Sequence, residues 1–238
     1  MKTLVIMPAF NEQRNIGKTI RQVLLKNRGI DVLIIDDGSK DDTLKLARKT
    51  KAEVVSHPFN MGYGVALQTG YKYALENDYD VVVQIDADGQ HDPKYVGKIV
   101  DHLVKNKADV VIGSRFKNRR DYQTPLLRRA GMLLFNFIVN KTTGWGLTDC
   151  TSGYQAISKK VLPFLVSDKF PVDYPDADLL IMLYFRGYKV TEMPMRMYES
   201  ETGQSMHSSL IKNFYYVAKM CLSIFTILLR KTTGVSER

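Results

Sequence analysis

The chain has 238 residues, of which 45% are hydrophobic and 25% are charged, so it is long enough for one sizeable globular domain with or without an appendage. Its formal net charge of +9 suits nucleic acid, an anionic membrane surface or a phosphorylated substrate as a partner. Two cysteines, Cys150 and Cys221, exclude a disulfide framework and a cysteine-rich zinc site and favour the reducing cytosol. We expect no signal peptide, because the first apolar run is too short, and no ordinary membrane span, because no stretch of about 18 uncharged apolar residues occurs.

Short apolar runs and helical patterns alternate through the first half of the chain. Pro8 is expected to end the first strand, and Asn11 is expected to cap the helix after it. The alternation predicts an α/β fold in which a mostly parallel sheet is covered by helices on both faces. The predicted strands are residues 4–7, 32–35, 54–55, 81–85 and 109–113, and the predicted helices are 12–25, 41–50, from about 66, and 95–105.

The second half of the chain carries weaker signals. An apolar helix at 126–139 is expected to pack on the sheet or on lipid, and a turn at 149–153 is expected to lead into a strand. A further helix opens near Asp176 and Asp178, whose charges suit a first helical turn. A strand at 189–194 and a helix from about 209 to 230 complete the prediction.

Two carboxylates, Asp86 and Asp88, stand directly after the buried strand at 81–85. In open α/β sheets, ligands bind just beyond the carboxyl ends of the strands. Gly89 lets the backbone turn there, and Gln90 adds a neutral oxygen. Oxygen ligands of this kind suit Mg²⁺ or Mn²⁺, which in turn bind diphosphate oxygens. A bare Asp-x-Asp also fits a solvated acidic turn, so the motif gains weight only beside others.

Other strand ends carry polar residues that suit a nucleotide. Asp36 and Asp37 follow the second strand and can accept hydrogen bonds from ribose hydroxyls or a base N–H. Gly62 and Gly64 allow a close backbone approach to a ligand before the next helix begins. Each segment equally fits a turn or a helix cap, and none forms a dinucleotide fingerprint or a Walker phosphate loop.

A basic cluster and an isolated acid follow the fifth strand. The arginine forks suit phosphate, although a solvated loop is the simpler explanation for some of them. Nucleic-acid binding is disfavoured, because the cluster lacks interleaved aromatic residues and a known motif. Asp149 is a candidate general base or acceptor ligand, and also fits a simple turn. The basic residues are Arg115, Lys117, Arg119, Arg120, Arg128 and Arg129.

The tail carries a narrow polar stripe at helical spacing on an otherwise apolar pattern. The apolar run from Met220 to Leu229 is too short to span a bilayer. An interfacial helix whose basic residues face lipid headgroups fits this pattern, and a helix packed on the core or in a dimer interface is the alternative. The stripe consists of Lys212, Lys219, Ser223, Thr226 and Arg230.

Taken together, the motifs resemble the family 2 glycosyltransferases of the GT-A fold, and most closely the polyprenyl-phosphate sugar synthases, which include the dolichol-phosphate mannose synthases. The resemblance covers residues 1–206 and implies a Rossmann-like catalytic domain, with residues 207–238 as an amphipathic C-terminal helix. The motifs, in the family's order, are Pro8-Ala9-Phe10-Asn11-Glu12, Asp36-Asp37-Gly38-Ser39, Asn60-Met61-Gly62-Tyr63-Gly64, the run from Asp86 to Pro93, Gly113-Ser114-Arg115-Phe116, and Asp149 with Ser152-Gly153-Tyr154.

The resemblance also implies roles for individual residues. Asp86 would approach the sugar donor, and with Asp88 and Gln90 it would hold Mg²⁺ or Mn²⁺. Arg115 and Arg129 would bind an acceptor phosphate, and Asp149 would lie near the reacting centre. The donor nucleotide would be bound by Pro8, Ala9, Phe10, Glu12, Asp36, Asp37, Asn60 and Gly64.

The implied activity is an inverting, metal-dependent transfer of sugar from a nucleoside diphosphate sugar to an undecaprenyl or dolichyl phosphate. It would take place on the inner face of the cell membrane, with the protein peripheral and cytoplasmic. An ionised phosphate acceptor needs positioning rather than a strong base, whereas a saccharide hydroxyl would need one, with Asp149 as the candidate. One departure is Ser200, where the family often has arginine three residues before a Gly-x-Ser loop; Arg196 is a possible substitute.

Three alternatives share parts of this pattern. A rhamnosyl or hexosyl transferase that extends a lipid-linked or cell-surface polysaccharide would keep every donor motif. A nucleotidyltransferase would also combine strand-end acids with a nucleotide, but it would release pyrophosphate. A non-catalytic membrane partner is the third alternative, because Ser200 departs from the family pattern. A small membrane protein or a second copy of the chain could serve as an additional partner.

Overall fold

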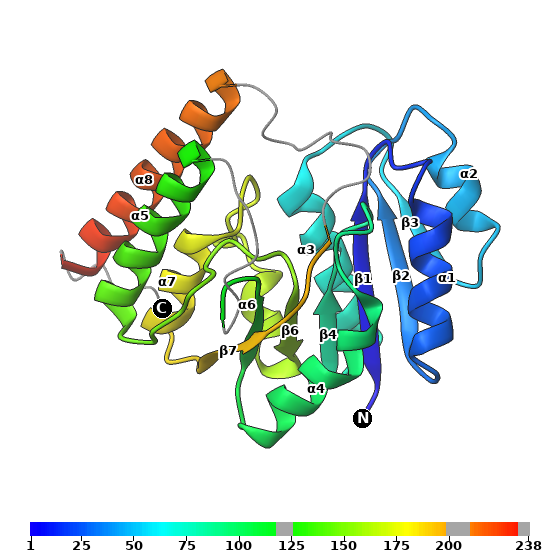
Figure 1. Ribbon diagram of the computed structural model, residues 1–238, viewed down its shortest axis with the longest axis horizontal. Helices are drawn as coiled ribbons and strands as arrows, with labels where there is room; N and C mark the ends of the chain where they lie inside the picture. Colours follow the sequence, from blue (N-terminus) through cyan, green and yellow to red (C-terminus); the bar gives the residue numbers. More distant parts are fainter. Residues whose placement is uncertain (118–125, 199–209, 233–238) are drawn as a thin grey trace.

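The computed structural model describes residues 1–117, 126–198 and 210–232. Within these ranges one sheet has the strand order β3-β2-β1-β4-β6-β5-β7 (Figure 1). The strands are β1 (Thr3–Ala9), β2 (Asp31–Asp36), β3 (Glu53–Ser56), β4 (Val81–Gln84), β5 (Val110–Ser114), β6 (Gln155–Ser158) and β7 (Val190–Pro194). The helices are α1 (Ile16–Lys26), α2 (Thr43–Arg48), α3 (Tyr63–Glu76), α4 (Val96–Lys105), α5 (Leu126–Thr143), α6 (Leu162–Leu165), α7 (Ala177–Phe185) and α8 (Leu210–Thr232), with short 3₁₀ turns η1 (Pro93–Tyr95) and η2 (Lys159–Val161).

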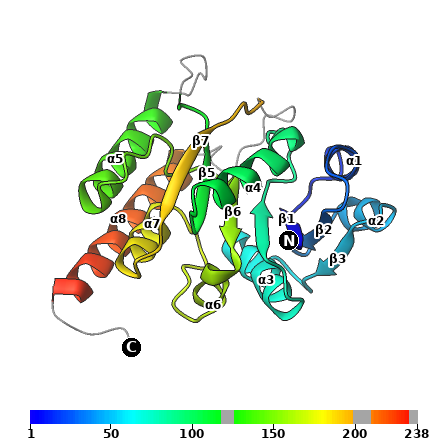
Figure 2. The same ribbon diagram turned by 90° about the horizontal axis from the view of Figure 1, so that it is seen from below.

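Alternate residues of the central strands enter two separate cores, which confirms the predicted helices on both faces. Leu4 and Ile6 of β1 pack in one core with residues of α3, α5, α7 and α8. Val5 and Met7 pack in the other core with residues of α1 and α4. Figure 2 shows α1 and α4 on one side of the sheet and α3 and α6 on the other. A strand buried on both faces explains the continuous apolar runs in the sequence.

The sheet reverses its strand order between β1 and β4. From β1 the chain continues to β2 and β3 on one side, and it then crosses to β4 on the other side of β1. The loops that follow β1 and β4 therefore diverge, and a crevice at such a point is where open α/β sheets bind ligands.

The predicted mostly parallel sheet is confirmed, and β6 is its antiparallel member. It runs against both β4 and β5, with Gln155 opposite Gln84 and Ile112. The start of β6 therefore lies at the edge of the sheet where β4 and β5 end. This direction brings the segment from Asp149 to Gly153 to the same edge as Asp86.

Two predictions near β1 were wrong. Pro8 does not end β1, which continues to Ala9. Pro8 is opposite Ile35 of β2, while β4 has already ended on the other side, so no partner strand requires the missing N–H. Asn11 does not cap α1, which begins at Ile16; its φ is 56°, and its side chain accepts a hydrogen bond from the backbone N–H of Lys40.

Helices α5 and α8 lie side by side beyond β7 (Figures 1 and 2). The rings of Phe135 and Tyr216 meet edge to face with centroids 5.9 Å apart, and Met220 and Ile224 of α8 are buried in the same core as α5 and α7. The tail helix therefore packs on the rest of the protein, against α5 and α7. Within the three described ranges, no helix has the length and apolar character needed to cross a membrane.

Two residues of the polar stripe of α8, Lys219 and Ser223, bind acids on other segments of the protein, whereas Arg230 is exposed. Lys219 forms an ion pair with Asp173, and the hydroxyl of Ser223 donates to Oδ2 of Asp178 over 2.7 Å. The expectation that the basic residues face lipid headgroups was therefore wrong for Lys219, because Asp173 binds it. The side chain of Lys212 lies outside the described part of the chain.

Candidate active site

Three carboxylates gather at the crevice between β1 and β4. Asp86 and Asp88 follow β4, and Glu12 follows β1. Burial raises the pKa of Asp88, and the charge of Asp86 raises it further. Burial also raises the pKa of Glu12, with smaller contributions from the charges of Asp88 and Asp86. Carboxylates whose pKa values are raised by burial and by a neighbouring carboxylate at a strand end are typical of a site that binds a cation.

The residues after β4 fit a hard divalent cation that a substrate helps to coordinate. Asp86, Asp88 and Gln90 offer two carboxylates and an amide oxygen, which are the donors that Mg²⁺ and Mn²⁺ prefer. In the part of the chain that the structure describes, no cluster of three or more His, Cys, Asp or Glu side chains could hold a metal without other ligands. Mg²⁺ commonly binds through one or two carboxylates together with substrate phosphates.

His91 supports Asp86 and is not placed as a metal ligand. Its Nδ1 accepts a 2.9 Å hydrogen bond from the backbone N–H of Asp86, so the neutral ring carries its proton on Nε2, which lies 3.6 Å from Oδ2 of Asp86. Burial, with the charge of Arg115 adding to it, lowers the pKa of His91 to about 4. The ring is therefore neutral at physiological pH.

Arg115 and Asp149 form a buried ion pair beside this cluster. The backbone N–H and Nε of Arg115 donate to Oδ2 of Asp149 over 2.9 and 2.7 Å, and Nη2 donates to Oδ1 over 2.6 Å. Asp149 is 0% exposed. A general base needs an oxygen that can reach the proton it removes, so this arrangement fits Asp149 as the residue that orients Arg115. Burial raises the pKa of Asp86, and the hydrogen bond from Tyr63 and the charge of Arg115 only partly oppose that rise.

Asp36 and Asp37 differ in what they bind. Oδ1 of Asp37 accepts from Nδ1 of His57 (2.7 Å) and from the N–H of Met61 (2.9 Å), and Oδ2 accepts from the N–H of Gly62 (2.9 Å). Asp37 therefore holds the glycine-containing loop in place. Asp36 accepts from Ser56 through Oδ2, whereas its buried Oδ1 has no hydrogen-bond partner among the residues that the structure describes. Such an orphaned oxygen fits a donor group of a ligand.

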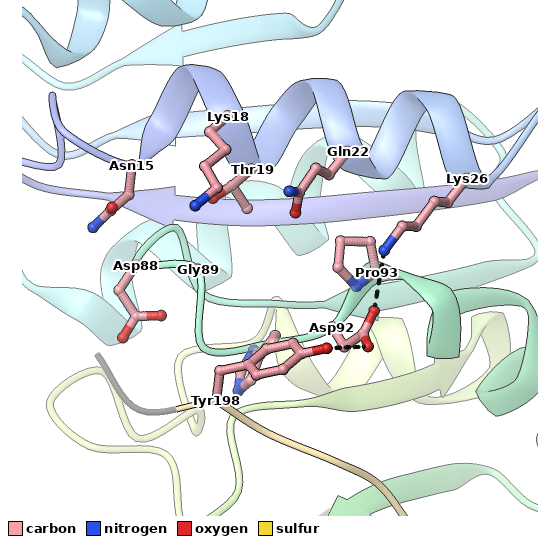
Figure 3. Close-up of a pocket in the computed structure, with 11 residues that line it drawn as sticks. Asn15, Lys18, Thr19, Gln22, Lys26, Asp88, Gly89, Asp92, Pro93 and Tyr198 are labelled. Atoms are coloured by element: carbon pink, nitrogen blue, oxygen red, sulfur yellow. Dashed lines mark hydrogen bonds and ion pairs between the residues drawn. The ribbon is translucent and has the colours of Figure 1, made fainter. Parts of the chain in front are cut away.

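A cavity of about 460 Å³ adjoins Asp88. Figure 3 shows one polar face of α1, with Lys18 and Lys26, opposite the loop from Asp88 to Pro93. Towards the end of this loop, Asp92 forms an ion pair with Lys26 (3.4 Å) and accepts a hydrogen bond from the hydroxyl of Tyr198 (3.0 Å). These contacts anchor the end of the loop that carries Asp88 and Gln90.

The comparison with family models identifies the chain. The model described as Glycosyl transferase family 2 matches residues 4–164. The chain belongs to glycosyl transferase family 2. This assignment makes it a sugar-transferring enzyme and confirms the resemblance inferred from the motifs.

Relatives and solved structures agree with the family. UDP-N-acetylglucosamine–dolichyl-phosphate N-acetylglucosaminyltransferase of Methanococcus voltae is 30% identical in an alignment of 230 residues that covers 88% of this chain and 91% of that protein. Polyprenol monophosphomannose synthase of Mycolicibacterium smegmatis is 31% identical over 222 residues, covering 87% and 81%. Glucosyl-3-phosphoglycerate synthase of Mycobacterium tuberculosis, crystallised with Mn²⁺, UDP-glucose and phosphoglyceric acid, has a TM-score of 0.71 at 22% identity and covers 94% and 79%. This last similarity shows the GT-A fold.

The remaining residues predicted to bind the donor lie in different settings. Pro8 and Ala9 are buried in β1, whereas Phe10 and Asn60 are exposed. Gly64 was expected to allow close approach to a ligand. Instead, a Cβ at this position would lie 2.1 Å from the backbone oxygen of Val172, so the close approach is to another part of the chain.

Arg129 and Arg196 are not among the buried residues of the site. Arg129 is exposed on α5, in contrast to the buried Arg115. Ser200 and the Gly-x-Ser loop at Gly203 lie outside the described residues. Arg196 is exposed, with its guanidinium 5.5 Å from the ring centre of Tyr198.

Three residues that contact or influence the site residues were not predicted from the sequence. Glu192 in β7 is buried, and it accepts from the backbone N–H groups of Thr148 and Asp149. Its signal in the sequence was a lone carboxylate within an apolar strand. Asp176 was treated only as a helix-end charge, yet it is close enough to Arg115 for their charges to interact. No pattern in the sequence singled out His57, which merely stands close after the strand predicted at 54–55.

Proposed function

We propose that this glycosyltransferase moves a sugar from a nucleoside diphosphate sugar to a polyprenyl phosphate, such as an undecaprenyl or dolichyl phosphate, with inversion at the anomeric carbon. The observation that carries the proposal is the crevice where Asp86 and Asp88 lie between Glu12 and the buried Arg115–Asp149 pair. The names of the two relatives supply the substrate class, because both describe sugar transfer to a polyprenyl or dolichyl phosphate.

The donor would bind across the ends of β1, β2 and β4. Asp36 would accept a hydrogen bond from the nucleoside through its orphaned Oδ1, and the exposed ring of Phe10 offers an apolar contact at the rim. Asp88 and Gln90, with Asp86, would hold Mg²⁺ or Mn²⁺. When bound there, the cation would neutralise charge on the diphosphate leaving group.

The acceptor phosphate would bind on the side of Arg115 and Arg129. A polyprenyl phosphate is already ionised near neutral pH, so it needs cationic groups that orient it rather than a base. Arg115 is held by Asp149 and also donates to the backbone oxygen and hydroxyl of Thr151. This rigid guanidinium suits a phosphate that attacks the anomeric carbon from the face opposite the diphosphate, which gives inversion.

The outer surface formed by α5 and α8 suits a membrane, and we place the enzyme on the cytoplasmic face of the cell membrane. Large apolar side chains are exposed on both helices. Isolated exposed apolar residues are common on protein surfaces, whereas a large contiguous group of them is uncommon. Lys141 and Arg129 are exposed on α5, where anionic headgroups would attract them. The exposed apolar residues are Leu133, Leu134, Phe137, Tyr215, Leu222, Phe225 and Leu229.

A second candidate function is extension of a lipid-linked or cell-surface polysaccharide. Asp176 favours it, because burial raises the pKa of this carboxyl to about 6, despite a hydrogen bond from the hydroxyl of Tyr216. A carboxyl that titrates near neutral pH is suited to remove a proton from a sugar hydroxyl. Asp149 is less suited to that role, because Arg115 occupies both of its oxygens.

The test is a panel of radiolabelled nucleotide sugars incubated with Mn²⁺ and either undecaprenyl phosphate or a lipid-linked saccharide. Label that enters the lipid phase only with the phosphate, as an acid-labile glycosyl phosphate of inverted configuration, supports the proposal. Label that requires the saccharide supports the second candidate. Release of pyrophosphate instead of a nucleoside diphosphate would contradict both and point to nucleotidyl transfer.

A further inference from the structure

Tyr63, the first residue of α3, contacts the carboxylate of Asp86 although 23 positions separate them. Its hydroxyl donates a 3.0 Å hydrogen bond to Oδ1 of Asp86 and accepts one of 3.0 Å from Nε2 of Gln84. Oε1 of Gln84 in turn accepts a 2.7 Å bond from the hydroxyl of Tyr71. The three bonds form one continuous chain from Tyr71 through Gln84 and Tyr63 to Asp86.

The direction of this chain follows from the donors available. An ionised carboxylate only accepts, and a tyrosine hydroxyl has one proton to donate. When Tyr63 donates to Asp86, it must accept from the amide nitrogen of Gln84, and the amide oxygen then faces Tyr71. A tyrosine hydroxyl ordinarily titrates at about pH 10, so this donor carries its proton at physiological pH.

Two further residues confine the same carboxylate. His91 accepts the backbone N–H of Asp86 and places its own Nε2 3.6 Å from Oδ2. A Cβ added at Gly153 would lie 3.1 Å from Oδ2 of Asp86 and 3.2 Å from the hydroxyl of Tyr63. The Asp86 carboxylate therefore has little room to rotate away from the orientation that Tyr63 sets.

We propose that Tyr63 is a positioning residue of the donor site, whose hydroxyl fixes the orientation in which Asp86 acts together with Asp88 on a divalent cation. The inference rests on the metal site of the proposed function. Tyr63 acts through Asp86 and not on the substrate. Groups that orient metal ligands in this way typically change metal affinity by about 10–100-fold when they are removed.

The test compares Tyr63→Phe with Tyr71→Phe in the full-length protein. Both substitutions remove one hydroxyl from the same chain of hydrogen bonds, but only the first hydroxyl touches Asp86. Mn²⁺ binding is measured by electron paramagnetic resonance with Mn²⁺ alone and with UDP or GDP present. We expect Tyr63→Phe to weaken Mn²⁺ binding by about 10–100-fold, and Tyr71→Phe to cause a much smaller loss at a similar cost in thermal stability.

Gly153→Ala provides a second perturbation of the same carboxylate that keeps the tyrosine. The added Cβ would press on Oδ2 of Asp86, so Mn²⁺ binding should again weaken; this variant decides the question if Tyr63→Phe does not fold. Folded Tyr63→Phe or Gly153→Ala protein that binds Mn²⁺ like wild type would overturn the inference, as would equal losses in the two tyrosine variants. Wild-type protein that binds no Mn²⁺ with either nucleotide would overturn the metal site itself.

Discussion

At the scale of single residues, the Arg115–Asp149 pair has the largest predicted effect on stability. Asp149→Asn leaves the buried guanidinium without a compensating charge, and the loss of one partner of a buried ion pair typically costs about 3–5 kcal/mol. We expect a loss of this size in the free energy of unfolding, measured by urea denaturation. Asp101→Asn, at an exposed position on α4, is the control and should change it by less than about 0.5 kcal/mol. Equal effects of the two substitutions would argue against the pair.

The sequence predicted those site residues whose position follows from a strand end. Asp86 and Asp88 come directly after an apolar run, so their place at the edge of the sheet needed no further information. The partners that fix their environment come from distant segments. Tyr63 opens a helix before β4, and Glu192 lies in β7. Contacts between such residues can be inferred only once the strand order is known, because no local sequence pattern encodes them.

At the scale of elements, Asp176 makes the junction of α7 and α8 sensitive to pH. Its folded-state pKa of about 6 lies above the ordinary value of 3.8, chiefly because of burial. The folded protein therefore holds this proton more tightly than the unfolded chain, so stability is lost as the pH rises from about 4 through 6. At pH 7.5 Asp176→Asn should increase the free energy of unfolding by roughly 1–3 kcal/mol, since one pKa unit corresponds to about 1.4 kcal/mol. At pH 4 the two proteins should be equal, and a difference that does not vary with pH would contradict this explanation.

The same junction shows what periodicity leaves undetermined. The sequence pattern predicted an amphipathic tail helix, and the structure confirms a helix there. The pattern does not say which stripe faces the protein, because Asp173 and Asp178, which bind Lys219 and Ser223, lie far away in the sequence. Removal of the whole helix would uncover the core around Met220, so point variants on its outer face are the sharper test of membrane binding.

Leu222 and Phe225 are 65% and 58% exposed on the outer face of α8. Leu222→Glu and Phe225→Glu should weaken co-sedimentation with anionic vesicles, because charged carboxylates replace apolar contacts with lipid. Their free energies of unfolding should stay within about 0.5 kcal/mol of wild type. The matched control is Met220→Ala on the buried face, which should cost about 2–5 kcal/mol of stability. A different result would identify this face as a protein interface: the wild-type protein does not co-sediment with vesicles, and the two glutamate variants differ from it in oligomeric state.

At the scale of the whole molecule, the fold class was predictable and the strand order was not. Alternating strands and helices require a layered α/β arrangement, and apolar runs without alternation require burial on both faces. The reversal between β1 and β4 and the antiparallel β6 depend on long crossover connections, which have no signature in the local pattern. These two features bring Glu12, Asp86 and Asp149 to one edge of the sheet, so they create the site that the separate motifs only suggested.

The central claim is that the oxygens after β4 bind a sugar donor through a divalent cation. The most direct measurement is sugar transfer to the lipid phase as a function of Mn²⁺ concentration, by wild type, Asp88→Ala and the exposed control Asp101→Ala. Transfer by wild type and Asp101→Ala should rise with Mn²⁺, whereas Asp88→Ala should lose roughly 10²–10³ in rate, because charge on the leaving diphosphate is no longer stabilised. Transfer by folded Asp88→Ala at the wild-type rate, with the same dependence on Mn²⁺, would contradict the claim.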